Sequence, residues 1–363
     1  MNKTLKVVIW VVVIALVIWG IVAISNNNSP EISSDEPIKI GAVLSLTGPA
    51  AQDGESIRNG IELAKKDLAK DGIEVEIVYQ DDKTEPADTV SAINVISSQN
   101  VEAIIGPTWS HLADAGIPVA DNLGLVTVMP ANTSEYVNAE SPYAFFTSLR
   151  IDQFVPELTK WLEQSGTQRI AVVRGQDAWY EVVELAVEKA VEAAGVEVVF
   201  SEKVPFGVDS ATMATVVTKL KATGADLVFA ELGDQQAVVN LFRKLQEQDY
   251  ITDVMSVSTT VGLVISEGNV QIPDGSNVYV LAPKSSEVFA DKYQEEYGIT
   301  PPPYADRSYD SLMLLVKGII EKGEMSLVDY LREESSYEGF VGKYDFDENG
   351  DIAGGEWVIE TLK

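Results

Sequence analysis

Apolar and polar residues follow two alternating patterns along most of the chain. Short, almost wholly apolar runs such as IKIGAVLSL at 38–46 are typical of strands buried on both faces. Between them lie segments with apolar residues at helical spacing. One of these, GESIRNGIELAKKDLAK at 54–70, places Ile57, Ile61 and Leu68 on one face. This alternation predicts a parallel sheet covered by helices on both sides.

The alternation restarts after PYAFFTSLRID at 142–152, so 38–150 and 151–280 form two similar halves. The later region 286–333 is mainly helical, and the tail 342–362 predicts two strands around a turn. The pattern therefore predicts an α/β protein built of two doubly wound parallel-sheet lobes.

We expect the chain to cross between the lobes three times, near 148–153, 280–285 and 338–342. The expected lobes are then 38–150 plus 283–338 and 151–282 plus 339–363.

The N-terminal residues have a different character. After a basic start at 1–6 that contains Lys3 and Lys6, VVIWVVVIALVIWGIVAI at 7–24 carries no charge and is long enough to span a bilayer as a helix. The basic flank predicts a cytoplasmic start and an exported remainder. Residues 7–24 are expected to be an uncleaved membrane anchor or a cleaved signal peptide, followed by a polar linker at 25–37. The protein would be tethered outside the cytoplasm, or secreted or periplasmic after cleavage.

Composition excludes several classes of protein. With 26 basic and 56 acidic residues the net charge is -30, which disfavours binding to nucleic acid. The absence of cysteine excludes disulfides and thiolate sites, and the single histidine, His111, excludes a multi-histidine metal site. No phosphate loop, zinc-binding helix or dinucleotide fingerprint is present. We therefore expect neither an enzyme nor a cofactor.

Two predicted strands end in segments of small and polar residues. These are IIGPTWSHLADAG at 104–116 and MPANTSEY at 129–136. Because ligands of doubly wound sheets lie beyond the carboxyl ends of the strands, we expect these two segments to face each other around one small ligand.

Several motifs resemble those of class I periplasmic binding proteins, in particular the branched-chain amino acid (Leu/Ile/Val) binding proteins of ABC importers. They occur in the expected order and cover nearly everything after residue 37: KIGAVLSLTGPAAQDGESIRNGIELA, YQDD, IIGPTWS, MPANTS, YAFFTSLRID and YDFDENGD. The resemblance implies the type I fold of that family, a hinge between the lobes, and delivery of a captured solute to a permease.

The resemblance also implies a ligand site. Ser110, Ala131 and Thr133 occupy the positions that hold the head group of an amino acid, and Trp179 occupies that of an aromatic residue from the second lobe. Ser110 at a helix start suits a carboxylate, because free N–H groups and the helix dipole favour negative charge there. Helix capping is the alternative role of Ser110 and Thr133, and Tyr180 is the alternative to Trp179 by one residue.

Two positions depart from the family pattern. Ser258 stands where an acid would hold the ligand ammonium, so Glu231 or Asp234 would have to replace it, or the ligand would lack an α-ammonium. Asp53 stands where close relatives often have an aromatic residue, which weakens the case for a leucine-sized side chain.

Two further signals have plainer interpretations. DFDENGDIAGGE at 345–356 fits a calcium-loop pattern, but its flanks are strand-like rather than helical, which favours a hairpin with Asn-Gly at its turn. His111 follows Ser110, but adjacent residues at a helix start point apart and no orienting acid is evident, so catalysis is not expected.

The sequence thus predicts an extracytoplasmic solute-binding protein of an ABC importer. Its expected partners are a small ligand (an amino acid or a related compound), permease subunits, and the membrane through the N-terminal helix. A membrane-tethered receptor domain that senses an amide, a carboxylate or an amino acid remains open as the alternative.

Overall fold

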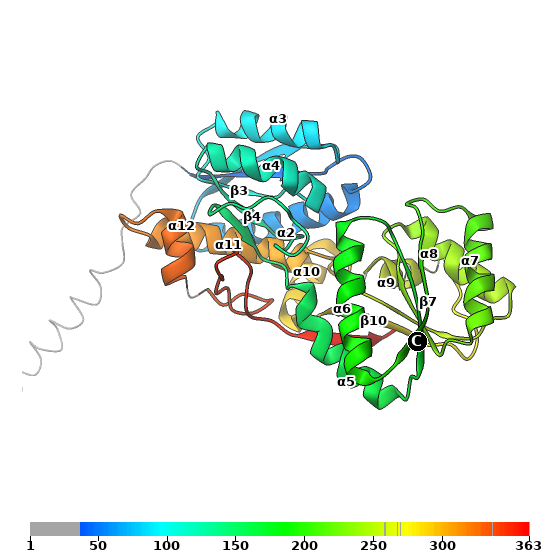
Figure 1. Ribbon diagram of the computed structural model, residues 1–363. Helices are drawn as coiled ribbons and strands as arrows, with labels where there is room; N and C mark the ends of the chain where they lie inside the picture. Colours follow the sequence, from blue (N-terminus) through cyan, green and yellow to red (C-terminus); the bar gives the residue numbers. More distant parts are fainter. Residues whose placement is uncertain (1–36, 258, 267, 269, 336, 363) are drawn as a thin grey trace, which may run out of the picture. The chain divides into compact units, whose positions relative to one another are not determined.

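The computed structural model describes residues 37–257, 259–266, 268, 270–335 and 337–362 (Figure 1). Residues 38–363 cluster as one compact unit by their contacts. Within the described residues, no helix has both the length and the apolar character needed to cross a bilayer. The expected membrane anchor at 7–24 lies outside the described residues.

The first sheet contains parallel strands in the order β2-β1-β3-β4-β5. Its strands are β1 (Ile38–Leu44), β2 (Val75–Asp81), β3 (Ala103–Ile105), β4 (Val126–Met129) and β5 (Ala144–Phe146). Since all of them run the same way, the segments that follow β1, β3 and β4 emerge at one edge.

Helices cover both faces of this sheet, as the sequence pattern predicts. On one face α3 (Pro86–Ser97) and α4 (Ser110–Asn122) pack against each other (Figure 1). On the other face α2 (Ala51–Lys70) packs against α11 (Ala305–Glu321), which returns from late in the chain, and α10 (Glu287–Tyr297) precedes α11.

Alternate strand residues form the two halves of this core. Val43 and Ile104 pack with the apolar side chains of α3 and α4. Their neighbours Leu44 and Ile105 belong to the cluster that contains α2 and α11. Because successive side chains of a strand point to opposite faces, a strand covered on both sides must be apolar throughout. The continuous apolar runs of the sequence have this origin.

The second sheet has the order β11-β10-β9-β8-β6-β7, and only β11 is antiparallel to its neighbour. Its strands are β6 (Arg169–Arg174), β7 (Glu197–Lys203), β8 (Leu227–Glu231), β9 (Asp253–Ser256), β10 (Val278–Pro283) and β11 (Trp357–Thr361). The helices of this part of the chain are α5 (Val155–Ser165), α6 (Ala178–Ala194), α7 (Ser210–Thr223), α8 (Gln235–Glu247) and α9 (Thr259–Ser266).

Local capping explains where these helices begin and end. The side chains of Asp177, Asp209 and Asp234 accept N–H groups in the first turns of α6, α7 and α8. Gly195 and Gly224 end α6 and α7 in the left-handed conformation, which glycine adopts without steric cost. Each of these helices is therefore delimited by residues that favour a helix end.

The elements between the two sheets are short. The 3-10 helix η1 (Ile151–Phe154) leads from β5 toward α5, and α12 (Leu327–Asp329) with η2 (Tyr330–Glu334) follows α11. On α11, the fully buried Asp310 accepts the Tyr344 hydroxyl at 2.8 Å and the Val341 N–H at 3.1 Å. One carboxylate thus fixes α11 to the segment that leads back to the second sheet.

The tail differs from the expected pair of strands around a turn. Gly350 N–H donates to the Asp347 carbonyl at 3.1 Å, which closes the predicted Asn-Gly turn, but only isolated bridges such as Phe346–Ile352 flank it. The Gly350 carbonyl accepts the Phe146 N–H at 2.7 Å, so part of the tail backbone bonds to β5 rather than to a partner strand of its own. A continuous strand appears only at β11.

Candidate functional site

The exits of β1, β3 and β4 are joined by buried polar contacts. Ser45 N–H after β1 donates to the Thr108 hydroxyl after β3 at 3.1 Å. The Asn132 amide after β4 donates to the Pro107 and Thr108 carbonyls, both at 3.1 Å. The expected meeting of IIGPTWS and MPANTSEY is therefore confirmed, with Asn132 as the residue that joins them.

Ser110 is the first residue of α4, and its side chain is half-buried. The N-cap is Trp109, which makes no side-chain capping bond, so the alternative role of Ser110 as a cap is wrong. Within the described part of the chain, the Ser110 hydroxyl has no hydrogen bond. It is therefore available, together with the free N–H groups of the first turn, to a ligand.

Ala131 and Thr133 lie in the buried loop after β4. The Ala131 carbonyl accepts the Tyr136 hydroxyl at 3.2 Å. The Thr133 hydroxyl makes a long contact of 3.4 Å to the Glu135 carboxylate and also interacts with the Tyr136 hydroxyl. No helix follows Thr133, so the capping alternative is wrong for this residue too.

Neighbouring side chains hold this loop in place. Glu135 accepts the N–H groups of Ile151 and Asp152, at the start of η1. Burial raises the pKa of the Glu135 carboxyl, and the Ile151 N–H bond opposes that rise. Ser134 N–H donates to Asp351 in the tail at 2.9 Å. The loop that carries Thr133 is thus fixed to both a crossing segment and the tail.

Asp53 lies in the first turn of α2 and accepts the indole N–H of Trp109 at 2.8 Å. Burial raises the pKa of the Asp53 carboxyl, and the Trp109 bond opposes part of that rise. Next to Asp53, the Gln52 side chain accepts a hydrogen bond from Gln235 of α8 at 3.1 Å. The first turns of α2 and α8 are therefore in direct contact.

Trp179 lies half-buried in the first turn of α6 and meets Tyr136 edge-to-face, with ring centroids 5.1 Å apart. Tyr180, the alternative, points elsewhere: a Cβ added to Gly175 or Gly233 would collide with its side chain. Of the two aromatic residues, Trp179 is the one in contact with the loop that carries Ala131 and Thr133.

Glu231 ends β8 and is 2% exposed. It accepts the Ser256 hydroxyl at 2.9 Å and the Val257 N–H at 3.0 Å. Asp234, the other candidate acid, caps α8 and also accepts the Gly207 N–H at 3.1 Å, so both candidate carboxylates accept hydrogen bonds from the protein. Ser258 lies outside the described residues.

Tyr304 and Arg307, which the sequence analysis did not single out, complete the set. They lie at the start of α11, where the Arg307 guanidinium is 5.5 Å from the Tyr304 ring centroid. Burial raises the pKa of the Tyr304 hydroxyl, the charges of Asp53 and Glu231 raise it further, and the charge of Arg307 lowers it. The Tyr304 hydroxyl is therefore within electrostatic reach of Asp53 on α2 and Glu231 at the end of β8. The sequence signal that could have identified these two residues is the segment YADR at 304–307, which follows a run of prolines.

The calcium-loop alternative finds no support in the contacts. Asp347 accepts the N–H groups of Asn349 and Asp351 within the turn, while Asp345 pairs with Lys343. Among the described residues, no cluster of three or more acids or histidines could hold a metal ion.

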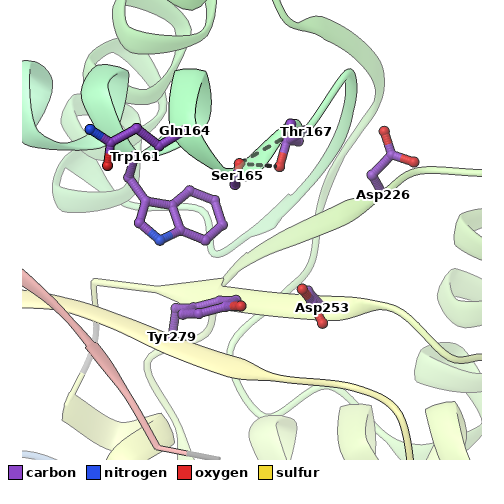
Figure 2. A pocket seen from close by; sticks show the side chains of 8 residues that line it. Trp161, Gln164, Ser165, Thr167, Asp226, Asp253 and Tyr279 are labelled. Carbon is purple, nitrogen blue, oxygen red and sulfur yellow. Dashed lines mark hydrogen bonds between the residues drawn. The ribbon is translucent and has the colours of Figure 1, made fainter.

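A separate hollow of about 510 Å³ lies near the amino ends of β8 and β9 (Figure 2). The rings of Trp161 and Tyr279 pack against each other there, with ring centroids 4.8 Å apart. Its carboxylates serve the backbone: Asp226 accepts two N–H groups at 3.0 Å, and Asp253 accepts the Asn277 N–H at 2.8 Å. It lies at the opposite edge of the second sheet from Glu231.

Comparison with known proteins agrees with this arrangement. The family model described as periplasmic binding protein matches residues 37–360. The chain belongs to the periplasmic binding protein family. It is thus a solute-binding protein and not an enzyme.

Several relatives are similar to this periplasmic binding protein over most of its length. The Leu/Ile/Val-binding protein of Escherichia coli K12 is 23% identical over 352 residues, which cover 94% of each chain. The leucine-, isoleucine-, valine-, threonine- and alanine-binding protein of Pseudomonas aeruginosa is 24% identical over 361 residues, again 94% of each chain.

Solved structures share the fold. A branched-chain amino acid transporter substrate-binding protein from Streptococcus pneumoniae, in complex with isoleucine, has a TM-score of 0.73 at 18% identity and covers 90% of this chain and 100% of its own. A solute-binding protein of an ABC transporter from Rhodopseudomonas palustris BisB5, in complex with 3,4-dihydroxybenzoic acid, has a TM-score of 0.77 at 22% identity, covering 90% and 93%.

Proposed function

We propose that this periplasmic binding protein is the extracytoplasmic substrate-binding component of an ABC importer, and that it captures a small amino acid or a related compound for delivery to the permease. The observation that supports the proposal is the contact between the two strand exits that carry the expected ligand residues, made by Asn132 with Pro107 and Thr108, together with the ring contact of Trp179 with Tyr136. The names of the relatives support the same ligand class.

In the proposed complex, the Ser110 hydroxyl and the free N–H groups of α4 hold the ligand carboxylate, because the helix dipole favours an anion there. The Ala131 carbonyl accepts from the ligand ammonium. Thr133 turns its hydroxyl from the distant Glu135 carboxylate toward the ligand. Trp179 covers the ligand from the second sheet, and Glu231 supplies the acid that Ser258 does not.

We further propose that 38–150 plus 283–338 and 151–282 plus 339–363 act as two lobes that close on the ligand. The contacts Gln52–Gln235 and Tyr136–Trp179 join residues of the two sheets and support a ligand-stabilised closed state. The apolar run at 7–24 is proposed to hold the protein at the outer face of the cell membrane.

A thermal-shift screen of the full chain in mild detergent tests the proposal. The panel holds aliphatic, polar and acidic amino acids, amides, simple carboxylates and sugars. A ligand at ~100 times its Kd stabilises the folded state by about 2.7 kcal/mol, which raises the Tm by a few degrees. We expect an amino acid or a related compound to produce this shift.

Variants then test the residues. Thr133→Ala should abolish the shift, Thr133→Ser should retain it, and Thr215→Ala should leave it unchanged, since the Thr215 hydroxyl bonds only to the exposed α7 backbone. Glu231→Gln should lower the affinity for an amino acid far more than the affinity for its deaminated analogue. Binding that survives Thr133→Ala would refute the assigned site.

A further inference from the structure

Arg307 is a mostly buried cation beside the proposed ligand site. Its side chain is 12% exposed and projects from the first turn of α11. A buried guanidinium is costly unless anions or acceptors satisfy its five N–H groups. The partners of Arg307 therefore indicate whether the residue is structural.

Arg307 lacks the partners that a structural arginine has. Its Nη1 donates to the Ser148 hydroxyl across a long 3.4 Å, and its buried Nε has no hydrogen-bond partner among the described residues. Within the described part of the chain, the one carboxylate within 4.0 Å belongs to Asp306, 3.9 Å from Nε.

Arg174 shows how this protein satisfies a structural arginine. Its side chain is 3% exposed. Its Nε donates to Glu184 at 2.6 Å, its Nη2 donates to the same carboxylate, and its Nη1 donates to the Gly175 carbonyl at 3.0 Å. By comparison, Arg307 has guanidinium N–H groups that make no hydrogen bond among the described residues.

The unused donors lie next to the proposed ligand loop. Ser148, the partner of Arg307, donates to the carbonyl of Pro130, which directly precedes Ala131. The Arg307 charge also acts on the hydroxyls of Tyr136 and Tyr304. Arg307 therefore lies beside Ser148 and the Tyr304 ring, next to the start of the loop that carries Ala131.

We propose that Arg307 pairs with a carboxylate of the ligand other than the one held by Ser110 and the free N–H groups of α4, so that the ligand is an acidic amino acid or a dicarboxylate. This inference rests on the proposed function. A leucine-like side chain would leave the guanidinium buried without an anion, whereas a carboxylate matches its planar fork. The polar Asp53, at a position where close relatives often have an aromatic residue, weakens the case for an aliphatic ligand.

Matched acid and amide ligands test the proposal on the full chain by calorimetry. Glutamate with glutamine and aspartate with asparagine test a side-chain carboxylate, and succinate with succinamate tests a dicarboxylate without an ammonium. We expect one acid to bind about 10- to 100-fold more tightly than its amide, as for a hydrogen bond to a charged group. Arg307→Gln should remove this preference, and the exposed Arg58→Gln should keep it.

The Tm without ligand separates this role from a structural one. Arg307→Met should leave the Tm unchanged or raise it, because it removes a cation that lacks an anion. Arg174→Met should lower the Tm, because it leaves Glu184 without its partner. A fall in Tm for Arg307→Met as large as that for Arg174→Met would overturn the inference.

The two proposals fail in different ways. Equal affinity for acid and amide, or a preference that survives Arg307→Gln, refutes the role of Arg307 while the proposed function stands. Absence of binding by every ligand in both panels refutes the proposed function and the inference with it. Loss of all binding in Thr133→Ala, with loss of the acid preference alone in Arg307→Gln, supports both.

Discussion

The Asp53 carboxylate accepts the indole N–H of Trp109 at 2.8 Å, and this bond joins the first turn of α2 to the exit of β3. A hydrogen-bonded acid thus stands where close relatives often have an aromatic residue. Asp53 is bound to Trp109, which directly precedes Ser110 of the proposed site.

Protonation of Asp53 should be visible at the Trp109 indole. Because burial raises the pKa of Asp53, the indole ¹⁵N–¹H signal of Trp109 should titrate with a midpoint above 3.8, the ordinary value for an aspartate. The chain has 6 tryptophans, and Trp109→Phe identifies the signal by removing it. Asp53→Asn should retain the bond but abolish the titration. A midpoint below 3.8 would contradict the burial of this carboxyl.

The Tyr136–Trp179 ring pair should affect ligand affinity more than fold stability. Trp179→Ala removes an edge-to-face pair of about 0.5–1.5 kcal/mol together with the surface that covers the ligand. We expect a loss of ligand affinity with a small change in Tm. Trp161→Ala is the matched control, because its pair with Tyr279 lies at the other edge of the second sheet. It should lower the Tm and leave the affinity unchanged, and the reverse pattern would argue against Trp179 as a ligand residue.

Asp310 should make the protein more stable as the pH falls from 7 to 5. Burial raises its pKa to about 6. The folded state therefore favours the neutral carboxyl. Its contribution to the free energy of unfolding is fully present below pH 3.8, the ordinary pKa of an aspartate, and is lost as the pH rises through about 6. A shift of this size corresponds to about 3 kcal/mol of unfolding free energy.

Urea unfolding at several pH values, in high salt to screen the net charge of -30, measures this effect. Asp310→Asn is the control, because an amide oxygen can still accept from Tyr344 and Val341 while the amide nitrogen faces the Tyr337 hydroxyl. The variant should show a flatter pH profile than the parent. Equal slopes in the two proteins would assign the pH dependence to other groups.

The Gln52–Gln235 contact should report closure. The chain has no cysteine, so Gln52→Cys with Gln235→Cys accepts nitroxide labels at these two positions alone. Ligand should increase the short-distance population between the labels, because the structure places the two side chains 3.1 Å apart. A pair within the helices of the first sheet, Ser91→Cys with Leu123→Cys, should show no change. A ligand-independent distance in the first pair would exclude closure at this contact.

Most of the fold was predictable because burial on both faces leaves a plain record in the sequence. Strands such as β1 and β8 are continuous apolar runs, and α6 and α7 carry an aspartate cap and a C-terminal glycine. Two features of the fold were not predicted. β5 was not singled out as a strand within PYAFFTSLRID, and the tail backbone is held by β5 rather than by a ladder of its own.

The site was less predictable than the fold. Ser110 and Thr133 could be proposed from the sequence because they follow apolar strands at positions that the family uses. Arg307 was missed because the helix around it carries a normal packing pattern, and an arginine in such a helix is most often exposed. Arg307 differs from Arg174 in its lack of hydrogen-bond and ion-pair partners, and this difference can be recognised only from the folded structure.

The bond from Ser134 to Asp351 spans 217 residues of sequence and has a consequence for biosynthesis. The loop that carries Thr133 can receive this support only after residue 351 has been synthesised. By then the strands β1 to β10 of the two sheets have been made, and β11 follows. Full support of the proposed ligand loop therefore comes late during synthesis, although the loop itself belongs to the first half of the fold.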